Sequence, residues 1–410
     1  MKNKPLPAKQ VALQIIRQLR RSGYQALLAG GCVRDMLLGK IPHDYDVATN
    51  AVPETITRLF PRTLTIGAQF GVVVVLAGGR QVEVATFRSD AEYPDGRRPQ
   101  RVVFTDARHD AERRDFTING MFYDPIAKQV IDYVGGQADL RNEIIRAIGD
   151  PSLRFAEDHL RMLRAIRFAC RFNYQIDPDT WQAIRLHAPS LARISEERIA
   201  AEFEKILIDP HRLRGVQLTR DSGLLPLTFP GLEPAACEIG LQTLAHLPSR
   251  CSFPLALAAV LVACPPQQVN NFCRRLKTSN DLRQHTSWLV ASYPKLLSAI
   301  PLSRGLLKKW LAEPLFEPLR QLLRCYLKGH NRSLTPLRRL QRQIRELGDE
   351  PISPPHLLDG HDLIHLGATP GPSLGQLVEE LYLAQLENQV KTRSQAEAWS
   401  RRWLIQHQKT

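Results

Sequence analysis

Asp44 and Asp46 form a D-x-D pair a short distance after a glycine-rich run, G-G-C-V-R-D at residues 30–35. On a β-strand, residues two apart point to the same side, so the two carboxylates can face one site. Two negative charges this close are unfavourable unless a cation lies between them, and Mg²⁺ prefers one or two carboxylates together with phosphate oxygens. The two glycines let the backbone approach a phosphate closely, and Arg34 adds positive charge. A phosphate-binding loop beside a metal site favours nucleotidyl transfer.

Glu83 lies in an alternating stretch, Q-V-E-V-A at residues 81–85, that is typical of a β-strand. A strand glutamate is usually just exposed to solvent. Beside a D-x-D pair in a neighbouring strand, however, a third carboxylate completes a two-metal site. One metal ion activates the attacking hydroxyl, and the other stabilises the triphosphate and the pyrophosphate leaving group.

A pair of arginines begins the second cluster, R-R-D-F-T-I-N at residues 113–119. Guanidinium groups suit bidentate contacts with phosphate oxygens. If a helix begins here, Asp115 and Asn119 lie on one face, four residues apart, and can bind ribose hydroxyls. In the alternative interpretation, Asp115 or Thr117 only caps a helix. The neighbouring motifs favour the functional interpretation.

The third cluster is E-D-H-L-R-M-L-R-A-I-R-F at residues 157–168, in which Arg161, Arg164 and Arg167 recur every third residue. Neighbouring arginines then lie close together on a helix. A solvated face with Glu–Arg pairs would give part of this pattern. Asp158 and Arg161, however, together offer an acceptor and forked donors, which can read the edge of a base without a template. Arg164 and Arg167 remain for phosphates or base stacking.

The elements that must position these residues follow from hydrophobic periodicity. Apolar residues at helical spacing predict a helix over residues 7–22, and Gly78-Gly79 predicts a hairpin turn. Strands are predicted at 26–29, 72–76, 81–87, 101–104 and 130–134. Helices are predicted near 156–172, 178–187, 195–207 and 210–222, with joints at 328–333 and 350–355 and a last amphipathic helix after Gly371-Pro372. The fold class is therefore α+β, a head with a small mixed sheet followed by an all-helical extension.

The bulk composition indicates a multidomain protein with a polyanionic partner. The chain has 410 residues, a formal net charge of +14 and a sequence pI of about 9.7, and an excess of this size favours RNA or DNA as partner over a merely basic protein. Its seven cysteines are scattered without C-x-x-C spacing, so we expect reduced thiols. With no signal-peptide pattern and no apolar run of about 18 residues, a cytoplasmic protein is expected.

Together, G-G-C-V-R-D…D-Y-D, R-R-D-F-T-I-N-G and E-D-H-L-R-M-L-R-A-I-R-F closely resemble the motifs of class II nucleotidyltransferases. This family comprises the bacterial CCA-adding tRNA nucleotidyltransferases and their sister poly(A) polymerases, within the polymerase β superfamily. The motifs occupy residues 25–172 in the family order and spacing. The resemblance implies a nucleotidyltransferase head at 1–150 and helical neck, body and tail domains at 151–222, 223–330 and 331–410.

The resemblance also implies the roles of individual residues. Asp44 and Asp46 would hold Mg²⁺, with Glu83 as the third carboxylate. Asp158 and Arg161 would select C or A, assisted by Arg164 and Arg167. The residues implied to bind the nucleotide are Gly30, Gly31, Arg34, Asp35, Arg113, Arg114, Asp115, Asn119, Asp158, Arg161, Arg164 and Arg167. The implied reaction is the template-independent transfer of CMP and AMP, from CTP and ATP, to the 3′ end of tRNA.

Three segments help to distinguish CCA addition from poly(A) addition. Residues 66–71 (I-G-A-Q-F-G) resemble the CCA-adding form rather than the basic element of poly(A) polymerases. The loop D-G-R-R-P at 95–99, expected to be flexible over the site, resembles the element of enzymes that add the terminal A, and residues 359–386 resemble a CCA-adding tail. The H-D pair at 361–362 also occurs in metal phosphohydrolases, but the further ligands of that chemistry are not found nearby, so a surface position in the tail is predicted.

The alternatives are an A-adding enzyme or poly(A) polymerase, a noncatalytic RNA-binding protein, and a small-molecule nucleotidyltransferase. The first shares every catalytic residue named above. The intact Asp44, Asp46 and Glu83 argue against the second, and the size and charge of the helical extension argue against the third.

Overall fold

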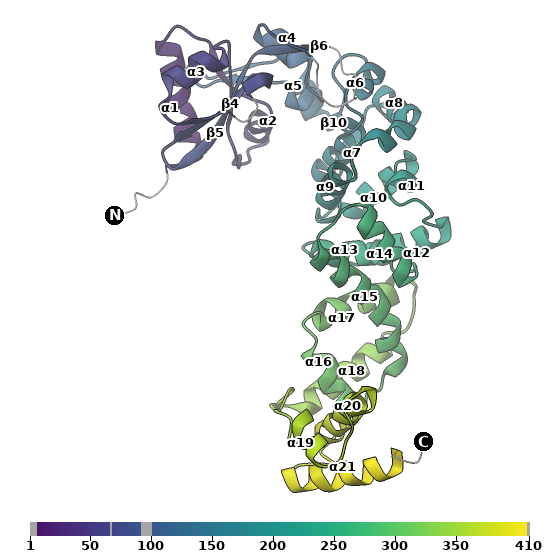
Figure 1. Cartoon of the computed structure of the whole chain (residues 1–410). Coiled ribbons are helices and arrows are strands. Elements are labelled where there is room, and N and C mark those ends of the chain that lie inside the picture. Colours follow the sequence, from purple (N-terminus) through teal and green to yellow (C-terminus); the bar gives the residue numbers. More distant parts are fainter. Residues whose placement is uncertain (1–5, 66–67, 92–100, 408–410) are drawn as a thin grey trace. The chain divides into compact units, whose positions relative to one another are not determined.

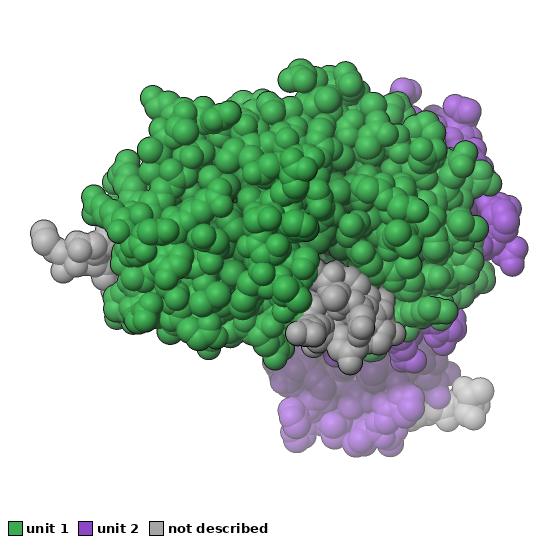
Figure 2. Space-filling view, turned by 90° about the horizontal axis from the view of Figure 1, so that it is seen from above, with its two compact units in different colours: residues 1–231, 275–278 green, residues 232–274, 279–410 purple. Residues whose placement is uncertain are grey.

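The computed structural model describes residues 6–65, 68–91 and 101–407. The chain forms two compact units, which Figure 2 distinguishes by colour. Unit 1 contains residues 1–231 and 275–278, and unit 2 contains residues 232–274 and 279–410.

A seven-stranded mixed sheet forms the framework of the first part of unit 1. Its strand order is β3-β4-β5-β2-β1-β8-β9. Strand β2 (Asp46–Thr49) pairs antiparallel with β1 (Ala26–Ala29) and parallel with β5 (Arg80–Thr86). The other strands of this sheet are β3 (Thr63–Leu64), β4 (Val72–Ala77), β8 (Phe122–Asp124) and β9 (Gln129–Ile131). The predicted small mixed sheet is confirmed, although β9 ends three residues earlier than predicted.

Helix α1 (Ala8–Arg21) buries the apolar stripe that the sequence predicts, from Val11 to Leu19. The hairpin between β4 and β5 turns at Gly78 and Gly79, which both have positive φ angles (55° and 72°). A Cβ atom on Gly78 would lie 2.9 Å from Cγ2 of Val11, so a side chain at this turn would push against α1. Glycine is required here for both conformation and packing.

The remaining short elements of the first 150 residues surround this sheet. The helices are α2 (Gly31–Leu37), α3 (Pro53–Leu59), α4 (Ala107–Glu112) and α5 (Gly136–Arg141), with 3-10 turns η1 (Ala68–Phe70) and η2 (Thr117–Asn119). Strands β6 (Arg88–Ala91) and β7 (Arg101–Phe104) form a separate antiparallel pair, and β10 (Ile144–Ile145) pairs in parallel with β11 (Gln175–Ile176).

The predicted helix over 156–172 is wrong in extent, because it is two helices. Helix α6 (Pro151–Glu157) begins earlier, since Asp150 caps it and Pro151 suits its first position. Asp158 then adopts an extended conformation (φ −145°, ψ 103°), and its carboxylate accepts from the backbone N–H of Leu160 (3.1 Å). Helix α7 (Arg161–Phe172) starts after this turn. The break places Asp158 on a loop and the arginines on a helix.

Apart from the two-residue strand β11, the rest of unit 1 is mainly helical, as predicted and as Figure 1 shows. It contains α8 (Pro178–His187), the 3-10 segment η3 (Ala188–Arg193), α9 (Glu196–Leu207), α10 (Arg212–Asp221) and α11 (Leu225–Thr228).

Unit 2 is helical throughout its described residues. Its helices are α12 (Pro234–Leu244), α13 (Phe253–Val260), α14 (Pro266–Arg275), whose last residue belongs to unit 1, α15 (Asn280–Ala299), α16 (Arg304–Ala312), α17 (Phe316–Gly329), α18 (Thr335–Leu347), α19 (Gly360–His365), α20 (Pro372–Leu386) and α21 (Arg393–His407). The two predicted joints fall between α17 and α18 and between α18 and α19.

Helix α20 begins at Pro372 and buries Leu377 and Leu381, as predicted. It is not the last helix, however, because α21 follows and buries Trp403 and Leu404 in the same core. His361 is exposed, as predicted. Asp362 completes a capping box with Asp359 at the start of α19, which explains this pair structurally.

All seven cysteines are free. Within the described ranges, no helix is both long and apolar enough to span a membrane.

Candidate active site

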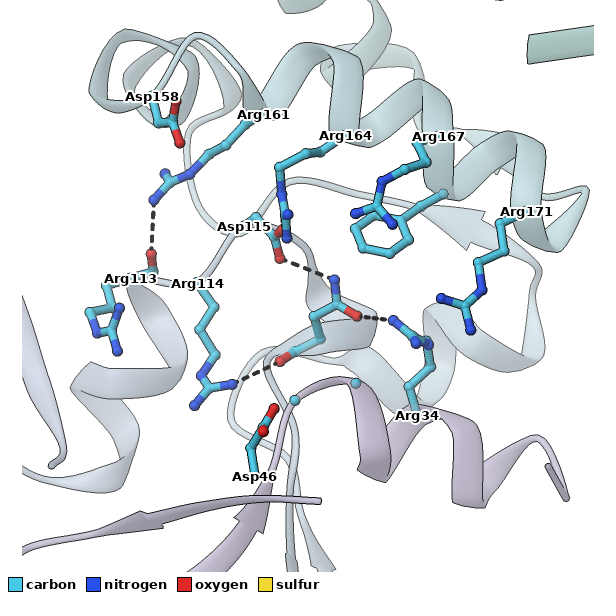
Figure 3. A pocket seen from close by; sticks show the side chains of 14 residues that line it. Arg34, Asp46, Arg113, Arg114, Asp115, Asp158, Arg161, Arg164, Arg167 and Arg171 are labelled. Atoms are coloured by element: carbon cyan, nitrogen blue, oxygen red, sulfur yellow. Dashed lines mark hydrogen bonds and ion pairs between the residues drawn. The ribbon is translucent and has the colours of Figure 1, made fainter. Parts of the chain in front are cut away.

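A cavity of about 500 Å³ in unit 1 collects most of the predicted site residues (Figure 3). The lining residues come from the turn after β1, the start of β2, the segment after α4, and the α6–α7 region. They are Gly30, Gly31, Arg34, Asp46, Arg113, Arg114, Asp115, Asn119, Asp158, Arg161, Arg164, Arg167, Phe168 and Arg171. The three sequence clusters, which begin at residues 30, 113 and 157, therefore meet at one site.

The glycine-rich turn fits tightly against the second cluster. Gly30 has a φ angle of +70° and precedes α2, where its backbone N–H donates to the carbonyl of Met121 (3.1 Å). A Cβ atom at Gly30 would lie 2.9 Å from Nη1 of Arg114. Any side chain at this position would therefore strain the backbone and displace an arginine of the cavity.

Arg34 points from α2 into the cavity and is held at both ends of its guanidinium group. Its Nη1 donates to Oδ1 of Asn119 (2.5 Å), and its Nη2 donates to Oδ1 of Asp35 (2.7 Å). Burial lowers the pKa of Arg34, and the Asp35 carboxylate opposes that shift. Asp35 does not line the cavity, so it acts on the site through Arg34.

Asp110 is a site residue that the sequence reasoning missed. It lies in α4 and is 1% exposed. Its Oδ1 accepts from Nη2 of Arg113 (2.6 Å), and its Oδ2 accepts from Nη2 of Arg114 (2.9 Å). The two arginines hold the pKa of this carboxyl below its ordinary value against the opposing effect of burial. A signal was available, since Asp110 precedes the arginine pair by three and four residues on a helical segment.

Asp115 and Asn119 lie close together, but the α-helix on which the prediction placed them is absent: Asn119 ends the 3-10 turn η2, and Asp115 precedes that turn. Nδ2 of Asn119 donates to Oδ1 of Asp115 (3.1 Å), and Nη2 of Arg164 donates to Oδ2 of Asp115 (2.5 Å). Burial would raise the pKa of Asp115, yet Arg164 and Asn119 lower it to about 2. The capping alternative is wrong, because Phe116 occupies the N-cap of η2 and Oγ1 of Thr117 donates to Asp139 (2.7 Å).

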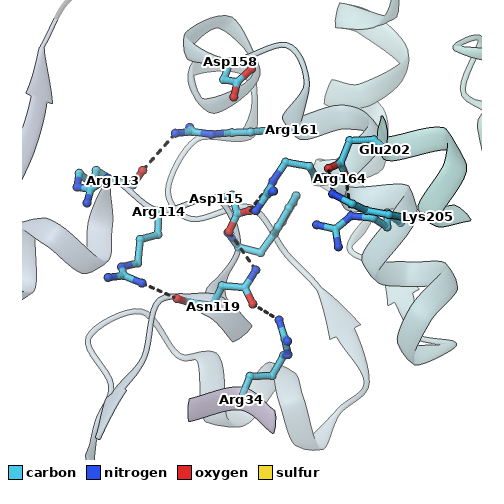
Figure 4. Close-up of polar contacts among 12 residues, drawn as sticks. Arg34, Arg113, Arg114, Asp115, Asn119, Asp158, Arg161, Arg164, Glu202 and Lys205 are labelled. Carbon is cyan, nitrogen blue, oxygen red and sulfur yellow. Dashed lines mark hydrogen bonds and ion pairs between the residues drawn. The ribbon is translucent and has the colours of Figure 1, made fainter. Parts of the chain in front are cut away.

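The arginines of α7 line the cavity, and each forms an ion pair with an acid; Figure 4 shows the contact of Arg164 with Asp115. Arg161 donates to Glu157 (2.6 Å), Arg164 to Asp115 and Arg167 to Glu202 (2.6 Å). The arginines of α7 therefore line the cavity, as the functional interpretation predicts, and they also form ion pairs, as the alternative interpretation predicts. Glu202 comes from α9, which no feature of the α7 motif could have indicated.

Asp158 and Arg161 both line the cavity, but each has another partner. Asp158 accepts from Nη2 of Arg198 (3.2 Å), and Nη2 of Arg161 donates to the backbone carbonyl of Arg113 (3.3 Å). Phe168 and Arg171 extend the lining beyond the residues predicted. The guanidinium of Arg167 lies 4.1 Å from the ring centre of Phe168, so cation and ring support each other.

Asp46 and Glu83 lie on neighbouring strands, but together with Asp44 they do not form one closed cluster. Asp46 is the first residue of β2, whereas Asp44 lies before that strand and is exposed, so the D-x-D pair is only half on a strand. Glu83 lies in β5, which pairs with β2 in a register that places Val47 beside Val84. Among the described residues, no group of three or more His, Cys, Asp or Glu side chains has the arrangement of a metal site.

The charges of Glu83 and Asp44 nevertheless affect the pKa of Asp46. Burial, the Glu83 charge and the Asp44 charge together raise the pKa of Asp46 to about 6, although Arg114 acts in the opposite direction. No described cation forms an ion pair with Asp46. The site therefore contains negative charge that the protein leaves uncompensated, which fits a bound cation.

Two segments used to distinguish the product fall wholly or partly outside the described residues. The loop at 95–99 is one, and residues 66–67 of the I-G-A-Q-F-G stretch are the other; the rest of that stretch forms η1.

Three family models match the chain in order. The Poly A polymerase head domain matches residues 26–146, the probable RNA and SrmB-binding site of polymerase A matches 173–236, and the putative tRNA nucleotidyltransferase domain 2 matches 254–397. Fold and site thus define a nucleotidyltransferase with a polymerase-β-like head.

Comparison with individual relatives shows to which family of nucleotidyltransferases the chain belongs. The chain is 33% identical over 405 residues to the CCA-adding enzyme of Streptococcus suis (strain 05ZYH33), covering 97% of each sequence. It is 38% identical over 311 residues to that of Geobacillus stearothermophilus, covering 76% of this chain and 74% of the relative. The Bacillus stearothermophilus CCA-adding enzyme solved in complex with CTP has a TM-score of 0.77 at 31% identity, with 98% of this chain and 99% of that chain covered. The chain belongs to the family of CCA-adding enzymes, and it is a tRNA nucleotidyltransferase that uses a divalent metal.

The fold also extends to more distant members. The Thermotoga maritima CCA-adding enzyme, solved with tRNA, has a TM-score of 0.69 at 21% identity and covers 98% of this chain and 97% of that chain.

Proposed function

We propose that this enzyme adds C, C and A to the 3′ end of tRNA without a template, using CTP and ATP. The observation that carries the proposal is the cavity itself, in which Asp46 and the glycine-rich turn face an arginine-rich wall. Such a cavity suits a triphosphate whose reacting phosphate lies near a metal-binding carboxylate. A relative of 31% identity that matches almost the whole chain was solved with CTP, which supports the choice of substrate.

In this proposal Asp44 and Asp46 hold Mg²⁺, and Glu83 adds a third carboxylate nearby. Carboxylate oxygens are ligands that Mg²⁺ prefers, and its remaining ligands are usually waters and substrate phosphates, so a closed protein cage is not required. The raised pKa of Asp46 supports a cation between these acids. When bound, the metal would activate the 3′-hydroxyl and stabilise the charge on the phosphates.

The nucleotide would lie along the arginine wall. Gly30, Gly31, Arg34, Arg113 and Arg114 would bind the triphosphate, because all of them line the same cavity as Asp46 and Arg114 lies beside that carboxylate (Figure 3). Asp115 and Asn119 would contact the sugar. Asp158 and Arg161 would select the base, with Arg164 and Arg167 in support. Each of these side chains is already held by a protein partner, so the wall is organised before the nucleotide binds.

We also propose the domain division at 1–150, 151–222, 223–330 and 331–410, and a cytoplasmic location. In this division the head and neck lie entirely within unit 1.

The test is nucleotide incorporation into tRNA transcripts that lack CCA, with CTP alone, ATP alone, and both together. The proposal expects two C residues with CTP alone and a complete CCA end with both. Incorporation of A without any C would instead identify an A-adding enzyme or poly(A) polymerase. Loss of all incorporation in Asp44→Ala would exclude a noncatalytic RNA-binding role.

A further inference from the structure

Unit 2 contains a second cavity, of about 680 Å³, that the proposed reaction does not use. Residues of α14 and α15 and the turn between α16 and α17 line it. Of its described lining residues, only Glu313 is acidic, whereas two arginines, Arg274 and Arg283, open onto it. The side chains of both arginines form no ion pair or hydrogen bond with any described residue. A cavity with unpaired cations at its rim fits an anionic ligand.

The inner wall of the cavity is aromatic. Trp288 lines it and is half-buried, and its ring packs edge-on against Trp310 with 6.1 Å between ring centres. This packing holds the Trp288 ring in place at the wall of the cavity. A fixed indole face beside arginines is the arrangement that stacks a nucleobase and holds its phosphate.

Polar groups in the same cavity lack protein partners. The hydroxyl of Ser287 is buried and has no hydrogen-bond partner within the described part of the chain. Gln267 and Asn270, on the facing helix α14, also line the cavity, and their amides form no side-chain hydrogen bond with described residues. The Ser287 oxygen is closed to solvent, so the two amides are the groups that can meet a ligand, and they suit one with donors and acceptors at its edge.

We propose that this cavity binds an unpaired nucleotide of the tRNA substrate, with the base stacked on Trp288 and a flanking phosphate on Arg274 and Arg283. The volume lies within the range of sites for small ligands and exceeds what one base requires, which leaves room for its sugar. The choice of RNA rests on the proposed function and on the net charge of +14. A nucleotide within a chain also explains why the cavity is open and carries its cations at the rim.

The first measurement is the Kd for a tRNA transcript lacking CCA, followed by fluorescence anisotropy, in Trp288→Ala and Trp288→Phe. Loss of one stacked base predicts about a tenfold higher Kd for Trp288→Ala, while Trp288→Phe remains near wild type because phenylalanine still stacks. The Kd for a blunt RNA duplex should not change in either variant, since that probe has no unpaired base. Equal Kd values for tRNA in wild type and Trp288→Ala would overturn the proposal.

The second measurement uses the double variant Arg274→Ala/Arg283→Ala, which removes no packed side chain and therefore decides the matter even if Trp288→Ala is unstable. The slope of log Kd against log salt concentration should fall by about two relative to wild type. Arg250→Ala is the matched control, because Arg250 is an exposed arginine of unit 2 outside the cavity and forms no ion pair with any residue that the structure describes. An unchanged slope in the double variant, or an equal fall per arginine in the control, would contradict a phosphate at this cavity.

Free nucleotide is the other source of the same chemistry, and photolabelling separates the two. An azido-ATP probe should label unit 1 but not the peptide that contains Trp288, whereas tRNA carrying a photoreactive unpaired base should label that peptide. Labelling of the Trp288 peptide by azido-ATP alone would overturn the assignment to RNA. CMP incorporation at saturating tRNA should be unaffected in all these variants, so failure of the second cavity is distinguishable from failure of CCA addition.

Discussion

The two arginine-bearing cavities differ in what holds their guanidinium groups. In unit 1, the arginines of the α7 row and the pair after α4 are tied to carboxylates such as Asp110, Asp115 and Glu202. In unit 2, Arg274 and Arg283 have no such partners among the described residues. A tethered guanidinium has lost its freedom before the ligand binds, whereas an untethered one must be ordered by the ligand. The first arrangement suits a reaction that needs fixed geometry, and the second suits attachment of a flexible chain.

Asp46 is the exception within the first cavity, because no described arginine or lysine forms an ion pair with it, although Arg114 acts on its pKa. Asp46→Asn should lower kcat for CMP incorporation about a thousandfold, since the amide removes a metal ligand at the reacting phosphate. The free energy of unfolding should not fall, because the substitution relieves the unfavourable burial that raises the pKa of Asp46. Incorporation assays and urea unfolding check both effects. Asp179→Asn, at an exposed aspartate of α8, is the control, and equal activity in the two variants would refute a metal-binding role for Asp46.

Substitution of Asp110 tests whether the ion pairs that hold Arg113 and Arg114 contribute to activity. Asp110→Asn leaves Arg113 and Arg114 without their shared carboxylate and should lower kcat/KM for CTP between about tenfold and a hundredfold, because the two phosphate-binding groups lose their fixed positions. The unfolding free energy should fall by about 3 kcal/mol, as expected when one member of a buried ion pair is removed. The measurements are steady-state kinetics and urea unfolding.

The control for this variant is Asp106→Asn on the same helix. Asp106 caps α4 and is exposed, and asparagine is an equally good cap, so this substitution should be nearly neutral. If Asp106→Asn and Asp110→Asn have equal effects, the loss comes from α4 and not from the arginine pair.

Asp115 predicts how pH weakens the first cavity. Its pKa in the folded protein is about 2, below the ordinary value of 3.8, so the ion pair with Arg164 stabilises the fold above about pH 4 and loses that contribution as the pH falls toward 2. The full contribution is about 2 kcal/mol by linkage. Asp115→Asn should therefore be less stable than wild type at pH 7, and the gap should narrow between pH 4 and pH 2. Urea unfolding at several pH values measures it, and a constant gap would contradict this account.

The sequence predicted the local parts of this site well and the distant parts poorly. The predicted bounds of α8 are those observed, because Asp177 and Pro178 give an unambiguous start signal. The glycine turn and the α7 arginines were recognised for the same reason, since each function depends on residues adjacent in sequence. The capping hypothesis for Asp115 failed because its true partner, Arg164, lies 49 residues away.

Glu202 and α21 are two further features that the sequence did not predict, because each depends on packing against another element. Glu202 approaches Arg167 across 35 residues of chain, and only the packing of α9 on α7 brings the two together. Helix α21 has a largely polar sequence, so its contribution to the tail core rests on a few residues such as Trp403. Periodicity cannot reveal a partner that another element supplies.

Substitution of Arg171 should have the smallest effect on activity of the variants considered. It also tests most directly whether a firmly held arginine contributes more to catalysis than a loosely held one. Arg171 lines the first cavity, yet its side chain is 46% exposed and lies 3.5 Å from Asp35, so it is held more loosely than Arg34, whose side chain is 4% exposed. If tethering measures the contribution to catalysis, Arg171→Ala should raise the KM for CTP roughly threefold and leave kcat unchanged, as for a weak, exposed ion pair. Steady-state kinetics at two salt concentrations would test this, because a screened contact should contribute less at high salt. A large fall in kcat would show that an exposed arginine contributes as much as a buried one, and the distinction between the two cavities would then rest on their ligands alone.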